Sequence, residues 1–584
     1  MLVRSVEPRR DPWLSPPGGS RRHRIIALGE GAHAWAARAD LTGRHARVAL
    51  WGDAIDVMQR LDGEIVLSAT DLVGFLACDH LTQVDLQVAL GLLEPPTRDD
   101  PYLDMLAGKG LAHEAKVLAR LRADRTCVEI CGDTRTRQGL LDAEADTLAA
   151  MRAGVDLVYQ ATFFDGRWRG HADFLLRVST PSALGSWSYE VADAKLAHSV
   201  KPRALTQLTE YSLQLARLQR VAPTLMHVAL GDGSWAILPV ADEMEEHMTA
   251  RSGLEASILG SPRPTYPERV DYCGVCRWAD VCADRRRAAD HPSPLPGMLA
   301  NRTRLLVDAG ITTVAALATA AEDPVDGFSD ATWERDRCHA RLLVEERSTG
   351  RPAYALLPHD MDGGLGALPA PSAGDLFFDI ESEPFGLPGG LEYLFGFVDV
   401  VDREPRYRAF WAHTREDERT AFEGAVDFML SRRARDRSLH VFHYASYEVS
   451  ALRRLAARHQ TRQAEIETLI STGVLVDLYQ VVKQSVRISR SSYSLKSLED
   501  FYMPRRDDAV SNAGGSMVGY ELWRQNGDDD VLEGIRIYNE RDCVSTLRLR
   551  DWLEERRREL ELTTGCTLVR PRLVSTAGAA SQTG

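Results

Sequence analysis

Residues 170–176 read GHADFLL and residues 189–195 read YEVADAK, a pattern typical of two apolar strands that each carry an acid near one end. Asp173 and Asp193 are those acids. Lys195 lies two positions after Asp193, so both side chains share one face of a strand. If the strands are neighbours, the carboxylates converge and can hold a hard divalent cation, while the ammonium group orients a water molecule. The pattern predicts a nuclease site, and the alternative is two edge strands with solvated ends.

Two predicted helices flank these strands. TQLTEYSLQLARL places Gln207 and Tyr211 at positions i and i+4 of one helical face. In KGLAHEAKVLARL, His113 lies off the apolar stripe, next to Glu114. The order of a helix His, a strand Asp, an acid-x-Lys and a QxxxY helix resembles RecB-like nucleases of the PD-(D/E)xK superfamily. The resemblance implies metal ligation by His113, Asp173 and Asp193, with catalysis by Lys195, Gln207 and Tyr211.

The composition describes an acidic chain that is long enough for several domains. Of its 584 residues, 44% are hydrophobic and 26% are charged, and the net charge is -14. We expect about three domains, because single hydrophobic cores stop growing well below this length. The net charge leaves only local basic strips for nucleic-acid binding. Because the sequence has neither a membrane-length apolar run nor a secretory signal, we expect a cytoplasmic protein with no membrane partner.

The cysteine spacing indicates a metal site. YCGVCRWADVC holds Cys273, Cys276 and Cys282 close together, and Cys78 precedes the acid-bearing strands. Four soft thiolates suit zinc or an iron-sulfur cluster, and the spacing alone does not choose between them. Iron-sulfur members of the RecB-like nucleases are similar in having one cysteine before the nuclease core and three after it. The resemblance therefore implies a 4Fe-4S cluster on these four cysteines, with Cys127 and Cys131 as the second-ranked ligands.

A second group of acids lies near the C-terminal end. DLFFDIESEP places Asp379 and Glu381 on one face of a strand, and RIYNERDCVSTL places Tyr538 and Asp542 one helical turn apart. Glu448 lies between them, in VFHYASYEVSALRRL. Four acids from three segments could bind two metal ions, with the tyrosine orienting a water molecule. Asp477 is either a further acid of the substrate groove or a helix cap.

These segments resemble the DEDD 3′-to-5′ exonuclease superfamily, in its tyrosine-bearing branch, on a ribonuclease H-like fold of the YprB type. The sequence departs from that pattern at Glu448, where Asp is usual, and at His443, where Asn is frequent. Basic and aromatic side chains in RISRSSYSLKSLEDFY could grip a single strand, or they could belong to a solvated loop. They are Arg487, Arg490, Tyr493 and Lys496.

The expected fold class is a multidomain α/β protein. In chain order we expect a disordered tail (1–23), an N-terminal segment of unclear role (24–65), a RecB-like PD-(D/E)xK nuclease with an iron-sulfur cluster (66–290), a connector like a helix-hairpin-helix (291–359), a linker (360–374), a ribonuclease H-like exonuclease (375–560) and a flexible tail (561–584). The connector could present backbone amides to phosphates or could simply be a packing unit.

The sequence predicts a metal-dependent nuclease that uses Mg2+ or Mn2+. Its expected substrate is single-stranded nucleic acid, DNA more than RNA, which it trims in DNA repair or processing. The chain has no GxxxxGK[ST] loop, and some members of the resembling family carry an appended helicase, so a separate helicase is a possible partner. The alternative is a nucleic-acid-binding scaffold with degenerate nuclease sites and a structural or redox-sensing metal cluster.

Overall fold

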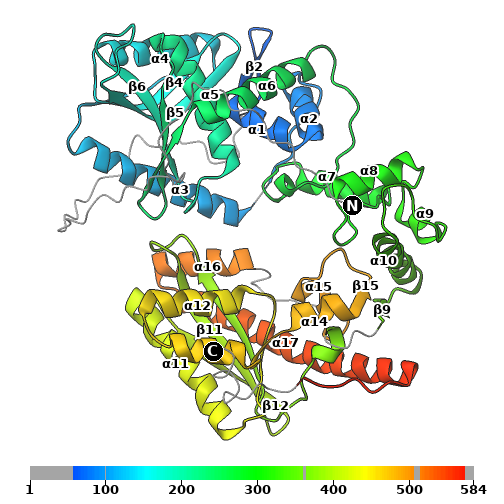
Figure 1. Cartoon of the computed structure of the whole chain (residues 1–584). Helices are drawn as coiled ribbons and strands as arrows, with labels where there is room; N and C mark the ends of the chain where they lie inside the picture. The colour runs from blue at the N-terminus through cyan, green and yellow to red at the C-terminus, as the bar shows by residue number, and fades with distance from the viewer. Residues whose placement is uncertain (1–56, 99, 359–362, 505–512, 572–584) are drawn as a thin grey trace, which may run out of the picture. The chain divides into compact units, whose positions relative to one another are not determined.

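The computed structural model describes residues 57–98, 100–358, 363–504 and 513–571, which are drawn in colour in Figure 1. They divide into two compact units. The first holds the described residues of 114–165 and 169–248, and the second holds those of 40–113, 166–168 and 249–584. The expected N-terminal tail, most of segment 24–65 and the end of the C-terminal tail lie outside the described residues. Among the described helices, none has the length and apolarity needed to cross a bilayer.

A mixed sheet organises the first unit. Its strands follow the order β3-β4-β5-β6-β7-β8, in which β3 pairs parallel to β4 and β6 pairs parallel to β7. The other neighbours are antiparallel. The bounds are β3 Cys127–Glu129, β4 Leu157–Phe164, β5 Trp168–Val178, β6 Ser188–Lys195, β7 Leu225–Leu230 and β8 Trp235–Pro239. The predicted strand pair is therefore present as β5 and β6.

Helices pack on this sheet through apolar faces. The C-terminal turns of α3 (Pro101–Arg122) bury Val117 and Leu121 against Phe174 and Ala192 of the strand pair. Helix α5 (Pro202–Gln219) begins with a proline in its first turn, a position where the missing N–H costs nothing, and follows β6 directly. Helix α4 (Arg137–Arg152) precedes β4. The sheet and helices together fix the ends of β5 and β6.

The N-terminal part of the second unit is small. A hairpin of β1 (Gln59–Leu61) and β2 (Glu64–Ser68) leads into α1 (Ala69–Ala77) and α2 (Asp79–Ala89). Leu72 and Leu86 from these helices pack against Leu254 of α6 (Ala241–Ser257). The short helix η1 (Asp271–Gly274) and α7 (Ala279–Ala288) follow. Cys78 is the N-cap residue of α2.

The expected connector is helical. Its elements are α8 (Ala300–Asp308), α9 (Val314–Ala318) and α10 (Asp330–Thr349). The first helix has Ala309 as its C-cap residue, and Thr313 caps the second through its side chain. The first amides of α9 already donate inside the chain: Val314 N–H to Asp290 O, and Ala315 N–H to the Asp290 carboxylate at 2.9 Å. These amides are therefore used in packing, and a phosphate would have to displace an acid to reach them.

A five-stranded sheet with order β12-β11-β10-β13-β14 forms the C-terminal part of the second unit. β10, β11 and β12 are antiparallel, whereas β10, β13 and β14 are parallel. The bounds are β10 Leu376–Glu383, β11 Leu391–Val401, β12 Glu404–Trp411, β13 Val441–His443 and β14 Leu475–Asp477. A small ribbon pairs β9 (Tyr354–Leu356) with β15 (Val486–Ile488).

Alternating side chains of β10 bury both faces of this sheet. Phe378 packs with α11 (Arg415–Arg435), α12 (Tyr447–His459) and α13 (Gln463–Ser471). Phe377 packs on the other face with α14 (Leu478–Ser485) and α17 (Asp529–Thr564). Two shorter elements, α15 (Leu495–Glu499) and α16 (Ala513–Asn526), precede α17. Figure 1 shows α11 and α12 at one side of this sheet and the long helix α17 crossing it.

Part of the expected linker (360–374) packs into the hydrophobic core that α14 and α17 form with the C-terminal sheet. The short helix η2 (Gly364–Ala367) and the residue after it bury Leu365 and Leu368 among the side chains of α14 and α17. A Gly/Pro/Ala-rich composition therefore does not keep this stretch out of the core, because two leucines in it suffice to anchor the backbone.

Candidate functional site

Three acids converge at the C-terminal sheet. Asp379 and Glu381 come from β10, and Asp542 comes from α17. One carboxylate oxygen from each lies within 4.8 Å of those of the other two. Asp379 is half-buried, and Glu381 and Asp542 are buried. Carboxylate oxygens at this spacing are the ligands that Mg2+ and Mn2+ prefer.

The pleat of β10 and a glycine in β11 make this convergence possible. Asp379 and Glu381 share a face with Phe377, and that face is covered by α17. Asn539 of α17 donates through Nδ2 to Asp379 Oδ2 at 2.7 Å and accepts from Tyr407 Oη at 2.8 Å. Gly396 pairs with Asp379, and a Cβ at Gly396 would lie 1.6 Å from Asn539 Oδ1. The helix can approach only because residue 396 has no side chain.

The electrostatics fit a site that is completed by cations. Burial, together with the charges of Glu381, Asp542 and Glu448, raises the pKa of Asp379 well above its usual range. Burial and Asp542 raise the pKa of Glu381 to about 7, although hydrogen bonds from Ser516 and Asn539 act in the opposite direction. Buried carboxylates that repel one another in this way gain most from a divalent cation between them. The donor set and its charge therefore fit Mg2+ or Mn2+.

A lysine and a tyrosine stand beside the acids. Tyr538 and Asp542 lie one turn apart in α17, as predicted, and Tyr538 is buried. Lys496 Nζ donates to Tyr538 Oη at 2.7 Å and lies 4.6 Å from the centre of the ring. The charge of Lys496 also acts to lower the pKa of Asp379 and Glu381. Since the lysine supplies one hydrogen of this contact, the phenol O–H of Tyr538 can be directed at another acceptor.

Glu448 does not join the three converging acids. It is buried in the first turn of α12, and its Oε2 lies 3.5 Å from His443 Nδ1. His443 Nδ1 is also 2.8 Å from Ala445 O. Burial raises the pKa of Glu448, and contact with His443 acts against that rise. The two departures from the exonuclease pattern thus contact each other, while Glu448 still acts on Asp379 through its charge.

Part of the chain matches a known protein family. A family model described as the RNase_H superfamily matches residues 376–554. These residues form an RNase H-like domain. RNase H-like nucleases use divalent metals and act on nucleic acid, and the three converging acids lie within this domain. No curated protein matches the chain.

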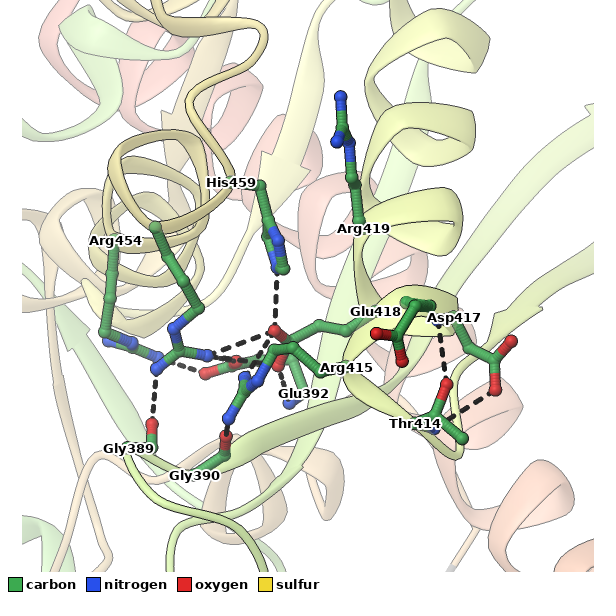
Figure 2. A network of polar contacts seen from close by, with 12 residues as sticks. Gly389, Gly390, Glu392, Thr414, Arg415, Asp417, Glu418, Arg419, Arg454 and His459 are labelled. Carbon is green, nitrogen blue, oxygen red and sulfur yellow. Dashed lines mark hydrogen bonds and ion pairs between the residues drawn. The ribbon is translucent and has the colours of Figure 1, made fainter. Parts of the chain in front are cut away.

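A polar network holds α12, and with it Glu448, on the RNase H-like domain (Figure 2). The fully buried Glu418 accepts from Glu392 N at 3.0 Å, from Arg458 Nη1 at 3.1 Å and from His459 Nε2 at 2.8 Å. Arg415 binds Glu418 and donates to Gly390 O at 2.7 Å. Three elements meet here: α11, the end of α12 and the turn between β10 and β11. The network therefore fixes the helix that carries Glu448.

Most side chains of the segment expected to grip a nucleic-acid strand already make contacts within the chain. Arg490 pairs with Glu346 and with Asp500. Tyr493 Oη donates to Val486 O at 3.0 Å, and Arg487 Nη1 donates to Lys483 O at 3.1 Å. Lys496 instead reaches the acidic site. Asp477 is the N-cap residue of α14, which agrees with the prediction that it could be a helix cap.

In the first unit, the predicted strand acids come together. Phe174 pairs with Ala192, so Asp173 and Asp193 are next to this pair on adjacent strands. Ala194 N–H donates to Asp173 Oδ2 at 2.8 Å, and Lys195 Nζ lies 2.5 Å from Asp193 Oδ2. Burial and Asp193 raise the pKa of Asp173 well above its usual range. Burial would lower the pKa of Lys195, but the charges of Asp193 and Asp173 outweigh it and raise that pKa.

Glu114 of helix α3, to which the RecB-like motif gave no role, also lies at these acids. Glu114 Oε1 accepts from Tyr159 Oη at 3.0 Å and from Gln160 Nε2 at 2.6 Å. Burial raises its pKa, and Asp193 raises it further. Its neighbour His113 stays a predicted ligand. Gln207 Nε2 donates to Tyr211 Oη at 3.2 Å, as the i, i+4 spacing predicts.

The four expected cysteine ligands line one cavity in the second unit. Cys78, Cys273, Cys276 and Cys282 share this cavity with His80 and Trp278. Val270 N–H and Trp278 N–H point at the sulfurs of Cys273 and Cys276, at 3.5 and 3.4 Å. Burial raises the pKa of Cys276 to about 11, so its thiolate needs a cation nearby. Cys127 and Cys131 lie in and after β3 of the first unit.

Asn539, Ser516 and Glu114 were not identified from the sequence. Asn539 could have been found, because it precedes Asp542 by three residues and so shares its side of α17. Ser516 acts on Glu381 from α16, a helix that carries no acid or base pattern, and the sequence offers no signal for it. Glu114 is adjacent to His113, and the choice between the two neighbours depends on helix rotation.

Proposed function

We propose that the chain is a metal-dependent nuclease that trims single-stranded DNA from the 3′ end at its RNase H-like domain. The observation that carries this proposal is the convergence of Asp379, Glu381 and Asp542 within 4.8 Å inside that domain. Divalent cations bound there would neutralise phosphate charge and lower the pKa of an attacking water molecule. A role in DNA repair or processing, and a separate helicase that supplies single strands, belong to the same proposal.

The chain's own residues would divide the work as follows. The three acids hold the cations, and Asn539 keeps Asp379 oriented toward them. Tyr538 directs its O–H at the water molecule or at a phosphate oxygen, because Lys496 already donates to the phenol oxygen. Lys496 adds a positive charge on the side where the phosphate would enter. Glu448 contributes negative charge from α12 at longer range.

The test is digestion of single strands labelled at the 5′ end, with Mg2+ or Mn2+, on DNA and RNA side by side. We expect the wild-type chain to produce a ladder of shortened products that Asp379→Asn abolishes. Asp402→Asn is the matched control, since Asp402 is an exposed acid in a turn of the same domain. Intact substrate with every metal would contradict the proposal and favour a binding scaffold with degenerate sites. So would a ladder that Asp379→Asn leaves unchanged.

We propose that Asp173, Asp193 and Lys195 form a second, RecB-like nuclease site. The support is the meeting of two buried carboxylates with a charge-paired lysine at the ends of β5 and β6. His113 or its neighbour Glu114 would complete the ligand set, and Gln207 with Tyr211 would contact the substrate. Asp379→Asn should remove the 3′ ladder of the first site, so cleavage of any other pattern that remains in this background, and that Asp193→Asn removes, would be assigned to the second site. Residual cleavage that survives Asp193→Asn would refute the assignment.

We propose further that the four clustered cysteines bind a 4Fe-4S cluster that staples residue 78 to residues 273–282. The support is that all four cysteines line one cavity, because four thiolates that face a shared space suit an iron-sulfur cluster or zinc. The cluster would stabilise the fold and take no part in cleavage.

Metal analysis of protein purified without oxygen tests this assignment. We expect a brown protein with about four iron atoms per chain, and loss of both colour and iron in Cys273→Ser. Cys566→Ser is the control, because Cys566 is exposed and lies outside the cavity. Colourless protein that holds zinc would refute the cluster, as would an iron content that Cys273→Ser leaves intact.

A further inference from the structure

An aromatic cluster lies on the same face of the C-terminal sheet as the acids. Glu381 pairs with Leu394, and Leu394 pairs with Trp411, so the three residues form one row across β10, β11 and β12. Residues directly opposite one another in antiparallel strands point to the same face. Neighbouring strands lie about 4.8 Å apart, and Trp411 is two strands away from Glu381. The backbones of these two residues are therefore about 10 Å apart.

Helix α16 leads from the acids to the same cluster. Ser516, Tyr520 and Trp523 are spaced i, i+4 and i+7, so they form one stripe along this helix. Ser516 hydrogen bonds to Glu381 and lies 2.7 Å from Tyr393 Oη. At 1.5 Å per residue, Trp523 lies about 10 Å farther along the helix than Ser516. Sheet and helix therefore place Trp411 and Trp523 at a similar distance from the acidic site.

The aromatic rings of this cluster pack against one another, and the inner rings are more buried than the outer rings. Tyr393 and Tyr520 are fully buried and parallel, with centroids 3.9 Å apart. The outer rings, Trp411, His413 and Trp523, are only half-buried. His413 stacks on Trp411 at 5.8 Å and lies 4.3 Å from Trp523. Two buried rings thus support three rings that keep part of their surface exposed.

The position of His413 is fixed by the start of α11. Thr414 caps this helix, and the Asp417 carboxylate accepts from Thr414 N at 3.1 Å (Figure 2). The same carboxylate accepts from His413 N at 3.3 Å. Tyr520 Oη lies 3.2 Å from His413 Nδ1. Burial lowers the pKa of His413, so its ring is neutral near pH 7 and stacks as an aromatic. A preorganised stack binds a further planar ring at a low entropic cost.

We propose that Trp411, His413 and Trp523 form a stacking platform for unpaired bases of the strand whose 3′ end lies at Asp379 and Glu381. Each unpaired base has a π face, and stacking on an aromatic side chain is independent of sequence. A distance of about 10 Å corresponds to roughly two or three stacked nucleotides at 3.4 Å each. The strand would run from the acids along α16 toward the half-buried rings of Trp411, His413 and Trp523. This inference rests on the proposed nuclease function and adds the strand's path to it.

Equilibrium binding tests the platform without cleavage. Full-length protein is titrated, without divalent metal, into single-stranded DNA that carries 2-aminopurine at one position counted from the 3′ end. We expect the deepest quenching at the second or third nucleotide. In Trp523→Leu and Trp411→Leu, we expect that quenching to disappear and affinity to fall about tenfold. Trp523→Phe keeps a ring and should retain most of both, which separates stacking from folding.

Trp235→Leu is the matched control, since Trp235 is a half-buried tryptophan of the first unit. Equal quenching at all positions, or unchanged affinity in both leucine variants, would overturn the platform. A fall in affinity that Trp523→Phe shares would overturn it too. The chromogenic ester thymidine 5′-p-nitrophenyl phosphate is too small to reach the platform. If wild type does not hydrolyse this ester with any metal, the nuclease proposal fails, while the quenching pattern still decides the platform.

Discussion

A single glycine decides how closely helix α17 approaches the sheet. Gly396 pairs with Asp379 on β11, and Asn539 of α17 occupies the space where a side chain would be. The same Asn539 holds Asp379 by a 2.7 Å hydrogen bond. The geometry of the acids therefore depends on a residue that has no functional group.

Substitution of Gly396 by alanine should damage the site. The added methyl group would lie 1.6 Å from Asn539 Oδ1, so Asn539 and the helix around Asp542 must move. We expect Mn2+ affinity to fall about 10- to 100-fold, the usual cost of disturbing a ligand's hydrogen-bond partner. Titration calorimetry measures this loss. Gly108→Ala is the control, because this glycine lies in helix α3 with an ordinary helical φ and no atom lies within 4 Å of a Cβ there. Wild-type Mn2+ affinity in Gly396→Ala would contradict the packing argument.

Lys496 offers a second test at the residue scale. Lys496→Met removes the positive charge that opposes protonation of Asp379 and Glu381, and it removes the donor to Tyr538. We expect Mn2+ to bind more tightly, on the order of tenfold, because a cation no longer repels it. We also expect slower cleavage, because Tyr538 loses its orientation. Lys496→Arg should restore the metal affinity. Weaker Mn2+ binding in Lys496→Met would show that Lys496 has a structural role only.

Helix α12 is held in place by buried charged groups. Its last turns supply Arg458 and His459 to Glu418, and its first turn supplies Glu448. Burial raises the pKa of Glu418, but its partners outweigh burial and the net pKa is lowered. A carboxylate so placed remains charged and fully paired at neutral pH.

Glu418→Ala should therefore be costly. It leaves Arg415, Arg458 and His459 without their shared acceptor, and breaking a buried ion pair costs about 3 kcal/mol or more. Urea unfolding followed by circular dichroism measures the change. Glu467→Ala is the control, because the Arg453–Glu467 pair is more than half exposed and should contribute less than about 1 kcal/mol. Equal losses of unfolding free energy in the two variants would mean that the buried ion pairs of Glu418 stabilise the fold no more than an exposed pair.

At the scale of the whole molecule, buried histidines contribute to the dependence of stability on acid. Burial lowers the pKa of His339, and separately of His440, from 6.5 to about 4. Unfolded chains bind the proton near pH 6.5, so below that pH the unfolded state takes up more protons than the folded state. The contribution of each histidine to stability should therefore fall as pH drops from about 6.5 to 4, by up to about 3 kcal/mol.

Thermal unfolding between pH 7.5 and 5 checks this dependence. We expect the melting temperature of His339→Asn or His440→Asn to rise relative to that of the wild-type chain as the pH falls. His198→Asn is the control, because His198 is exposed. If both buried-site variants lose as much stability toward acid as the wild type, the histidines do not cause the loss.

The sequence by itself determined the local patterns. Period-two alternation identified β5, β6 and β10 with their acids, and i, i+4 spacing identified the pairs Gln207–Tyr211 and Tyr538–Asp542. Side-chain direction in a strand or helix follows from backbone geometry, so neighbours in sequence suffice for such predictions.

Only the tertiary structure decided which distant groups meet. It joined Lys496 to Tyr538, placed Asn539 against Gly396, drew Glu448 to His443 and buried two leucines of the expected linker. These contacts depend on how helices rotate and how closely they pack against a sheet. That choice is made by the whole core, because its close-packed side chains must fill space together, and no short stretch of sequence contains it.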